Sequence, residues 1–521
     1  MWIPTDFCED ARMARNEGIG FWLTRRAELT PSRTALVFEG RQWTYREFNQ
    51  QVDRCAAALT DLGVCHGDRV AVLTINVPQF LEVLFACGKL GARFVPLNFR
   101  LAGPELSFIV NDAGVHTIVV GPEFIELVDL VRPQLCVRHY LALQAAEGGD
   151  WLDYDDVVSR AAAAPSDNEV KHDEVAIIMY TSGTTGRPKG AMLTHGNLLW
   201  NNINAALSFD TLEDDITLVC APLFHIGGLN VTTLITLLKG GTVVLLRAFD
   251  PAKVLDLIEE HRVNSMFGVP AMFLFMSQLP GFGDRDLSSV RSFICGGAPV
   301  PEPLIRLYQD RGIPFVQGYG LTETAPFATL LPKQDSLRKV GSAGLAPMFT
   351  EVRVVDDRMD DVKTGEIGEV VIKGPNVMKG YWNRPDATAQ AITHGGWFHS
   401  GDLGVFDEDG YLYLKDRMKD MIISGGENIY PAELESVLID HPAVADVAVI
   451  GTPDEKWGEA VVAVVVKTEG VELSPQDVID FANGRLARYK LPRQVVFTDL
   501  LPRNPAGKVL KRELREQFGS S

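Results

Sequence analysis

The sequence lacks the features of a nucleic-acid-binding, disulfide-bonded or zinc-binding protein. Its 521 residues include 49 Lys and Arg against 68 Asp and Glu, a formal net charge of −19. Nucleic-acid binding needs clustered Lys and Arg, so we expect no nucleic-acid partner. The seven Cys are odd in number, scattered and without a CxxC pair. This distribution indicates neither a disulfide framework nor a zinc site.

Segments that direct a chain to a membrane or to export are also missing. No run of about 18 or more apolar residues occurs, so we expect no transmembrane segment. The N-terminal MWIPTDFCEDARMARNEG has mixed charge, without the basic stretch and apolar stretch of a signal peptide. We therefore expect a cytoplasmic protein whose cysteines are mostly buried thiols in a reducing compartment.

The length and the apolar runs predict an α/β fold with more than one domain. A chain of 521 residues exceeds the roughly 250–300 residues at which single cores stop growing. Short continuous apolar runs alternate with helical patterns, which predicts mostly parallel sheets covered on both faces. These runs are 69–74, 117–120, 175–180, 242–246 and 292–295.

The pattern changes twice in the second half of the chain. From about Glu351 the strands are shorter, with a hairpin expected at 408–410, which indicates a β-rich subdomain. A helix beginning at Pro431 then opens a small α+β unit of about 100 residues. We predict two domains, residues 1–417 and 418–521. In the second domain we expect strands at 447–450, 461–466 and 495–498 and a helix near 477–488.

One glycine-rich segment, YTSGTTGRPKG at 180–190, predicts a site for a polyphosphate. It follows an apolar run and precedes a helix expected to begin near His195. Hydroxyls and glycines let side chains and backbone N–H groups turn toward an anion, and Lys189 adds a positive charge. It is not a Walker A loop, because Pro188 stands where that motif needs Gly. The alternative is a Ser/Gly-rich surface turn. The candidate phosphate ligands are Thr181, Ser182, Gly183, Thr184, Thr185, Gly186 and Lys189.

Further motifs follow in a fixed order, and together they carry a family resemblance. They are GGAP at 296–299, QGYGLTET at 317–324, HSGDLG at 399–404, KDRMKDMIISGGENIYP and NPAGKVLKREL. From about Thr44 to Leu514 the chain resembles the adenylate-forming superfamily of acyl-CoA synthetases, firefly luciferase and peptide-synthetase adenylation domains. It most resembles the fatty-acyl and aryl CoA ligases.

The resemblance implies a reaction and a fold. ATP and a carboxylic acid (fatty, aryl or alicyclic) would give an acyl-adenylate, and coenzyme A would then give the acyl-CoA, with Mg²⁺ as the metal. A large N-terminal AMP-binding domain with mostly parallel sheets and a β-rich subdomain would carry a small α+β C-terminal domain that rotates between two poses.

The resemblance also implies roles for the nucleotide-site residues. Tyr319 is similar to an adenine-stacking aromatic residue, Thr322 to a phosphate ligand, and Glu323 to the carboxylate that reaches Mg²⁺. A single carboxylate is how Mg²⁺ held by phosphates is usually bound. Asp402 is similar to a residue that accepts from the ribose hydroxyls, and Arg417 to one that contacts the ribose or the phosphate. Either alone would suggest a surface ion pair. The remaining nucleotide-binding candidates are Gly296, Gly297, Ala298, Gln317, Gly318 and Gly320.

The C-terminal motifs correspond to the two poses of the family. Lys508 resembles the lysine that stabilises charge while the carboxylate attacks the α-phosphate, although by itself it reads as an ordinary solvated lysine. Lys419 resembles the hinge residue. The stretch containing Ser424, Gly425 and Gly426 faces the active site in the second pose and leaves room for the pantetheine arm of CoA.

The acyl pocket is expected around Phe224-His225-Ile226-Gly227-Gly228-Leu229. His225 is counted both as a catalytic candidate and as pocket lining, and the apolar character of the segment suits an aliphatic or aryl acid. A packed helix and loop is the alternative. The predicted lining is His225, Gly228, Leu229, Val269, Gly320 and Ala325.

Different activities within this superfamily compete with CoA ligation. Peptide-synthetase domains place Asp after the Phe that corresponds to Phe224, to hold an ammonium, whereas this chain has His225. Burying an ammonium without a counter-charge is costly, so an amino acid is disfavoured. An acyl-AMP ligase that serves a carrier protein, a luciferase-like oxidation and a binding protein without activity stay open as well. A homodimer is also left open.

Overall fold

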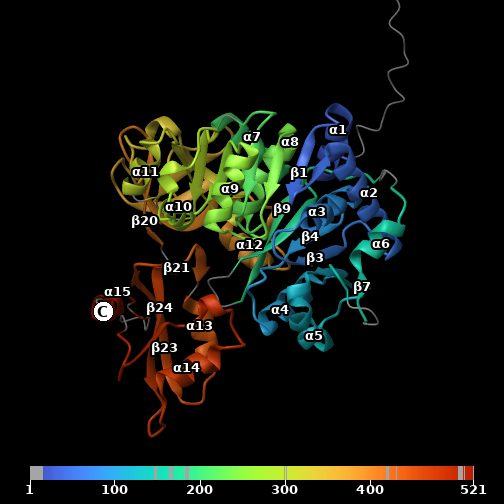
Figure 1. The fold of residues 1–521 in the computed structure, drawn as a ribbon. Helices are drawn as coiled ribbons and strands as arrows, with labels where there is room; N and C mark the ends of the chain where they lie inside the picture. Colours follow the sequence, from blue (N-terminus) through green and yellow to red (C-terminus); the bar gives the residue numbers. More distant parts are fainter. Residues whose placement is uncertain are drawn as a thin grey trace, which may run out of the picture.

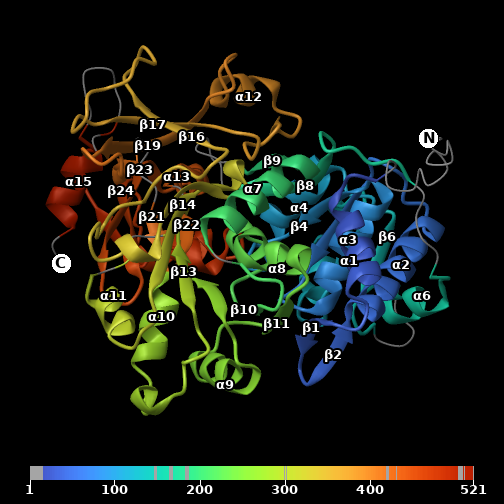
Figure 2. The ribbon, with the colours of Figure 1, turned by 90° about the horizontal axis from the view of Figure 1, so that it is seen from above.

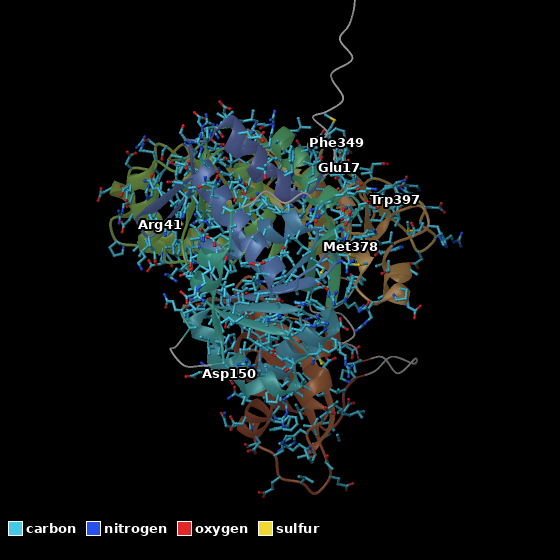
Figure 3. The ribbon with its side chains drawn as sticks, turned by 90° about the vertical axis from the view of Figure 1, so that its right-hand side faces the viewer. Glu17, Arg41, Asp150, Phe349, Met378 and Trp397 are labelled. Carbon is cyan, nitrogen blue, oxygen red and sulfur yellow. The ribbon has the colours of Figure 1, made fainter. Side chains whose placement is uncertain are left out.

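The computed structural model describes residues 16–145, 150–163, 168–181, 187–209, 211–297, 300, 302–417, 422–429, 431–502, 509 and 511–519. Two lobes built around large sheets lie above the orange-red C-terminal region in Figure 1. The same arrangement appears from the side in Figure 3, where the C-terminal region again lies beneath the rest of the chain.

The first lobe contains an eight-stranded sheet in the order β18-β9-β8-β4-β3-β5-β6-β7. Alternate residues of β3 belong to different apolar clusters: Val70 and Val72 to one, Ala71 and Leu73 to the other. Because side chains alternate across a strand, both faces of this sheet are covered. The strands are β3 (Arg69–Leu73), β4 (Arg93–Pro96), β5 (Thr117–Val120), β6 (His139–Ala142), β7 (Leu152–Asp153), β8 (Val175–Thr181), β9 (Lys189–Thr194) and β18 (Gly380–Tyr381). The helices are α1 (Ile19–Leu29), α2 (Tyr45–Asp61), α3 (Pro78–Leu90), α4 (Gly103–Ala113), α5 (Ile125–Val131) and α6 (Tyr154–Arg160).

The second lobe contains another eight-stranded sheet, in the order β15-β14-β13-β12-β10-β11-β1-β2. Its inner strands are parallel, and β2 and β15 pair antiparallel at the two edges. The strands are β1 (Thr34–Phe38), β2 (Arg41–Thr44), β10 (Ile216–Val219), β11 (Thr242–Leu245), β12 (Ser265–Gly268), β13 (Ser292–Gly296), β14 (Phe315–Gly320) and β15 (Phe327–Leu331). The helices are α7 (His195–Ser208), a π-helix (Gly228–Thr233), α8 (Leu234–Lys239), α9 (Pro251–His261), α10 (Pro270–Ser277) and α11 (Glu302–Gln309).

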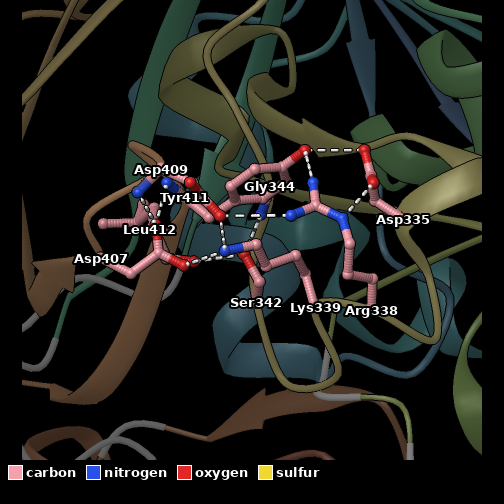
Figure 4. Close-up of polar contacts among 9 residues, drawn as sticks. All are labelled: Asp335, Arg338, Lys339, Ser342, Gly344, Asp407, Asp409, Tyr411 and Leu412. Carbon is pink, nitrogen blue, oxygen red and sulfur yellow. Dashed lines mark hydrogen bonds and ion pairs between the residues drawn. The ribbon is translucent and has the colours of Figure 1, made fainter.

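A four-stranded antiparallel sheet forms the β-rich subdomain, along one edge of the molecule in Figure 2. It consists of β16 (Glu351–Val355), β17 (Gly368–Lys373), β19 (Phe398–Phe406) and β20 (Leu412–Arg417), with α12 (Pro385–Ala391) nearby. An ion cluster fixes the turn between β19 and β20 to the segment that follows β15 (Figure 4). Lys339 Nζ donates to Asp407 at 2.7 Å, and the hydroxyl of Tyr411 donates to Asp335 at 2.7 Å. The cluster therefore ties the β-rich subdomain to the second lobe.

The C-terminal region is an α+β unit around a five-stranded sheet, in which β25 pairs parallel with β24. Its elements are β21 (Ile422–Ser424), β22 (Glu427–Ile429), α13 (Pro431–Leu438), β23 (Val444–Asp454), β24 (Gly458–Lys467), α14 (Pro475–Ala482), β25 (Gln494–Phe497) and α15 (Lys511–Phe518). The predicted fold class is confirmed. Within the described parts of the chain, no helix is long and apolar enough to cross a membrane.

Two local predictions differ from the structure. The sequence predicted no strand between the glycine-rich segment and α7, yet β9 pairs with β8 in a hairpin, with Thr181 opposite Lys189. The helix expected near 477–488 begins and ends earlier, at Pro475–Ala482. It stops because Asn483 is extended and Gly484 has φ +79°, a backbone conformation that glycine adopts readily.

Candidate active site

A cleft is lined by residues of both lobes and of the C-terminal region. Several parts of the chain form its walls: the loop after β4, the ends of β8 and β14, the segment around His225, and two C-terminal segments. The residues that line the cleft are Pro96, Leu97, Asn98, Leu101, Ile109, Met179, Tyr180, Thr181, Pro188, Phe224, His225, Gly320, Leu321, Thr322, Glu323, Gly426, Glu427, Tyr489 and Lys490.

The carboxylate of Glu323 is held at the wall of this cleft. Glu323 lies in a 3₁₀ turn, Thr322–Thr324, and is 8% exposed. Its Oε1 accepts hydrogen bonds from the hydroxyl of Tyr381 at 2.8 Å and from that of Thr181 at 3.4 Å. Its backbone oxygen accepts from the N–H of Met378, labelled in Figure 3. Strands β8 and β18 thus bring the predicted Thr181 and Glu323 together with Tyr381, which the sequence reasoning missed.

Buried asparagines hold the segment that follows Glu323. Both amide hydrogens of Asn376 are donated at 2.7 Å, to the backbone oxygens of Thr324 and Phe327. Asn230, on the π-helix, donates to the oxygen of Ala325 at 2.6 Å. Buried backbone oxygens need such partners, so these two amides fix the path of the turn. Neither asparagine carries a sequence signal of this role, because the contacts span large distances along the chain.

Tyr319 and Asp402 meet beside the cleft. The hydroxyl of Tyr319, on β14, donates to Oδ2 of Asp402, on β19, at 2.6 Å. Asp402 is 3% exposed and pairs across the strands with Arg417 of β20. Gln317 is also buried, and its Nε2 has no hydrogen-bond partner among the residues that the structure describes. The structure therefore gathers polar groups from both predicted nucleotide motifs.

The glycines predicted at the nucleotide site lie where the backbone passes close to neighbouring atoms. A Cβ on Gly320 would lie 1.7 Å from the backbone oxygen of Pro326, and one on Gly318 would lie 3.1 Å from the ring of Phe327. Gly297 has φ +83°, and a Cβ on Gly296 would lie 2.9 Å from the oxygen of Gly318. Glycine at these positions lets β14 approach its neighbours closely.

His225 contacts the C-terminal region across the cleft. Its Nε2 lies 3.1 Å from Oε2 of Glu427, which also forms an ion pair with Arg100. The rings of His225 and Phe224 lie 4.3 Å apart. The surrounding protein atoms, and secondarily the charge of Arg100, lower the pKa of His225 to about 3. The imidazole is therefore neutral near pH 7.

The segment predicted to contact CoA, which contains Ser424, Gly425 and Gly426, packs against Val269 of the second lobe. Gly425 and Gly426 form a turn between β21 and β22 with φ +60° and +80°. A Cβ on Gly426 would lie 3.3 Å from Val269, and one on Gly425 would lie 2.8 Å from the ring of Trp457. Ser424 is buried. The turn therefore packs closely against Val269 and Trp457, where larger side chains would not fit without a shift.

Only some of the residues predicted for the acyl pocket line this cleft. A Cβ on Gly228 would lie 2.2 Å from the backbone oxygen of Pro222, so this glycine faces the preceding loop. A Cβ on Gly227 would instead lie 2.9 Å from the ring of Phe267. Among the described residues, the lining of the cleft includes His225 and Gly320 but not Gly228, Leu229, Val269 or Ala325. Leu229 and Ala325 are fully buried in the core.

Eight predicted site residues lie outside the described part of the chain. They are Ser182, Gly183, Thr184, Thr185, Gly186, Ala298, Lys419 and Lys508. Lys189, at the start of β9, is described, and its Nζ lies 5.4 Å from the centre of the Tyr381 ring. The thiols of Cys55, Cys65, Cys87, Cys136, Cys220 and Cys295 are free.

Known proteins match the chain over nearly its whole length. The family model "AMP-binding enzyme" matches residues 23–382, and "AMP-binding enzyme C-terminal domain" matches residues 433–508. The chain belongs to the AMP-binding enzyme family. This confirms the resemblance to adenylate-forming enzymes. The predicted domain boundary after Arg417 falls between the two matched regions and stays a prediction.

Two curated relatives are similar over almost all of their own length. Feruloyl-CoA synthase of an Amycolatopsis species is 48% identical over 97% of this chain and 100% of that protein. Long-chain-fatty-acid–CoA ligase FadD13 of Mycobacterium tuberculosis is 45% identical over 97% of this chain and 99% of that protein.

Two solved structures of o-succinylbenzoate CoA synthetase from Bacillus subtilis differ in their TM-scores to this chain. A double mutant bound to its product analogue OSB-NCoA has a TM-score of 0.86 at 36% identity, covering 95% of this chain and 98% of that chain. The complex with the acyl-adenylate intermediate OSB-AMP has a TM-score of 0.70 at 35% identity, covering 95% and 97%. This chain therefore has an overall arrangement nearer to that of the product-analogue complex.

Proposed function

We propose that this AMP-forming acid–CoA ligase activates an acid that carries an aromatic ring. The chain is an ATP-dependent ligase that acts through an acyl-adenylate, as the family match and the curated relatives together indicate. The choice of an aryl acid is supported by the 48% identity to feruloyl-CoA synthase and the 45% identity to indoleacetate–CoA ligase of Aromatoleum aromaticum. Phe267, beside Gly227, places an aromatic ring next to the predicted acyl segment.

A long-chain fatty acid is the second candidate, because FadD13 is 45% identical over nearly the whole chain. An amino acid is disfavoured by the side chains at the cleft. His225 is neutral near pH 7, and Glu427, the carboxylate that contacts it, already pairs with Arg100. An ammonium would therefore be buried without a counter-charge, which is costly.

In the first half-reaction, a carboxylate oxygen of the acid attacks the α-phosphorus of ATP, and the bond to pyrophosphate breaks. We assign to Thr181, Lys189 and Thr322 the phosphate contacts, and to Tyr319 and Asp402 the nucleoside. The remaining residues of the glycine-rich segment and Lys508 have the roles that the family resemblance implies. Lys508 would stabilise the negative charge that develops during attack.

Glu323 fits a Mg²⁺ site of the kind that holds a nucleotide. It offers one hard carboxylate, oriented by Tyr381 and Thr181, and Mg²⁺ commonly binds one or two carboxylates together with substrate phosphates. No cluster of three or more acidic, His or Cys ligands occurs among the described residues, so the phosphates would supply the other ligands. When bound, the ion would neutralise charge on the phosphates.

In the second half-reaction, the sulfur of CoA attacks the carbonyl carbon of the acyl-adenylate, and AMP leaves. Gly426 lines the cleft and has no side chain, which would leave room for the narrow pantetheine arm. The higher TM-score to the product-analogue complex supports the view that this arrangement of the domains is the one for thioester formation. Rotation about Lys419 to a second arrangement is part of the proposal.

The test is an assay of AMP release with ferulic, indoleacetic, long-chain fatty and amino acids, with and without CoA. We expect CoA-dependent turnover with a kcat/KM for the best aryl acid at least tenfold above that for any fatty acid. A higher kcat/KM for fatty acids overturns the aryl assignment and favours the second candidate. Turnover that needs a carrier protein and ignores CoA overturns CoA as the acceptor. The homodimer and the cytoplasmic location stay predictions.

A further inference from the structure

Lys490 is a lysine whose ammonium lies in the interior of the protein. It belongs to a 3₁₀ turn, Arg488–Lys490, and is 2% exposed. Its Nζ donates to Oε1 of Glu105 and to Oε1 of Glu433, each at 2.7 Å. A buried ammonium is costly unless it is paired and hydrogen-bonded. These two contacts are therefore what makes its burial tolerable.

The two carboxylates come from different parts of the molecule. Glu433 lies on α13, in the C-terminal region that also contains Lys490, whereas Glu105 lies on α4 in the first lobe. Rotation of the C-terminal domain as a body would keep Lys490 with Glu433. It would separate Lys490 from Glu105. The contact between Lys490 and Glu105 is therefore specific to the present arrangement of the domains.

Charge also favours this arrangement. Two carboxylates face one ammonium, and both are nearly buried, Glu105 at 8% and Glu433 at 4% exposed. Burial, opposed by Lys490 and assisted by Glu105, raises the pKa of Glu433 above its usual value. Glu433 therefore retains a proton to higher pH than a solvated glutamate, and the charge of the triad comes closer to balance.

The triad of Lys490, Glu105 and Glu433 lies beside the part of the cleft where CoA is proposed to bind. Lys490 lines the cleft together with Gly426 and Glu427. The neighbouring Tyr489 accepts a hydrogen bond of 3.4 Å from Asn98, on the loop that precedes α4. A small rotation that loosened the triad would thus also shift the turn at Gly426 relative to His225.

We propose that Lys490 is a positioning residue for thioester formation, which acts by bridging Glu105 and Glu433 and so holding the C-terminal domain over the cleft. The bridge stabilises the arrangement in which Gly426 lies against Val269. It makes no contact needed for adenylate formation, which the other pose of the domain performs. The inference rests on the proposed two-pose mechanism.

The test uses Glu105→Gln, which keeps the shape of the side chain, removes its charge, and leaves one acceptor oxygen where Glu105 accepts from Lys490 and from the N–H of Ala102. We expect it to slow acyl transfer from preformed acyl-adenylate to CoA about tenfold or more in single-turnover kinetics. Adenylate formation should change less than twofold, which also reports that the variant is folded. Glu126→Gln, the loss of an exposed charge on α5, is the matched control and should change neither rate.

A double-mutant cycle with Lys490→Met distinguishes a bridge from two separate effects. If both residues act through one contact, the double variant transfers the acyl group no more slowly than Lys490→Met alone. Equal slowing of both half-reactions, an unchanged transfer rate in Glu105→Gln, or fully additive effects would each overturn the proposal. The rates are compared for the acid that gives CoA-dependent turnover, so an error in the assigned acid leaves this test intact.

Discussion

The hydroxyl of Tyr381 donates a hydrogen bond of 2.8 Å to Oε1 of Glu323, and the backbone of Tyr381 pairs with Ala191 on β9. The same short strand, β18, therefore orients the proposed Mg²⁺ ligand and borders the strand that begins with Lys189. The proposed metal ligand and the proposed phosphate ligand are thus connected through this strand.

Replacing Tyr381 by Phe should weaken the binding of Mg²⁺ and slow adenylate formation. The variant removes the hydroxyl that orients Glu323, and a hydrogen bond to a charged group contributes about 1.5–3 kcal/mol, or roughly tenfold or more in rate. We expect a lower rate of adenylate formation and a higher Mg²⁺ concentration at half-maximal rate. A magnesium titration measures both.

Tyr411→Phe is the control for that variant, because its hydroxyl donates to Asp335 in the ion cluster of Figure 4. It removes the same kind of bond outside the residues that line the cleft. An equal shift of the magnesium midpoint in both variants would contradict the role assigned to Tyr381.

Gly228→Ala should impair the protein without selecting among acids. The new Cβ would lie 2.2 Å from the backbone oxygen of Pro222, which cannot move aside without shifting the chain. Overpacking of this kind costs typically about 1–3 kcal/mol. We expect a lower Tm and a similar fractional loss of kcat/KM for small and large acids.

Gly227→Ala should behave differently, because its Cβ would meet the ring of Phe267 at 2.9 Å, and a ring can turn. We expect Tm to stay close to that of the parent while kcat/KM falls more for bulky acids than for acetate or propionate. The ratio of kcat/KM for a large and a small acid measures this. A loss that is the same for all acids would place Phe267 away from the acyl pocket.

The regular elements were largely predictable, whereas the partners of the site residues were not. The run 117–120 was predicted as a strand and is β5, because four buried apolar positions in the middle of a parallel sheet leave an unbroken apolar signal. Strand β9 was missed because it begins inside the glycine-rich segment, and only three of its residues, Ala191, Met192 and Leu193, are apolar. Tyr381, Asn376 and Lys490 were also missed. Each acts through a contact distant in sequence, and a tyrosine, asparagine or lysine on its own gives no sign of such a contact.

Lys508→Ala should slow the first half-reaction and leave the second nearly unchanged. Negative charge builds on the transferring oxygens only while the carboxylate attacks the α-phosphate, and removing a donor at that point costs about 10²–10³ in rate. We expect adenylate formation to fall by that factor while supplied acyl-adenylate reacts with CoA at a near-normal rate. If single-turnover kinetics show both steps slowed equally, the two-pose mechanism fails for this protein.

Gly426→Val should slow only the second step. Gly426 has φ +80°, where a β-branched residue is strained by roughly 1–2 kcal/mol, and its Cβ would lie 3.3 Å from Val269. We expect acyl transfer to CoA to slow about tenfold or more, with adenylate formation unchanged. Slowing of adenylate formation alone would contradict the place given to this turn.

Glu82 should make the stability of the first lobe depend on pH. It lies on α3, is 3% exposed, and accepts a hydrogen bond of 2.9 Å from the hydroxyl of Tyr154. Burial raises the pKa of Glu82 from 4.5 to about 7. The folded state thus binds this proton more tightly than the unfolded chain. The stability that it contributes is full below about pH 4.5 and is lost as the pH rises through about 7.

Glu82→Gln should therefore remove a pH-dependent penalty. The amide keeps the shape of the side chain and the acceptor for Tyr154 but carries no charge at any pH. Relative to the parent, we expect the variant to gain roughly 1–3 kcal/mol at pH 8.5 and little or nothing at pH 5. Tm measured at pH 5, 7 and 8.5 tests this, because the difference between variant and parent should grow with pH. A difference that is constant across the three values would show that the pKa of Glu82 is the same in the folded and the unfolded protein.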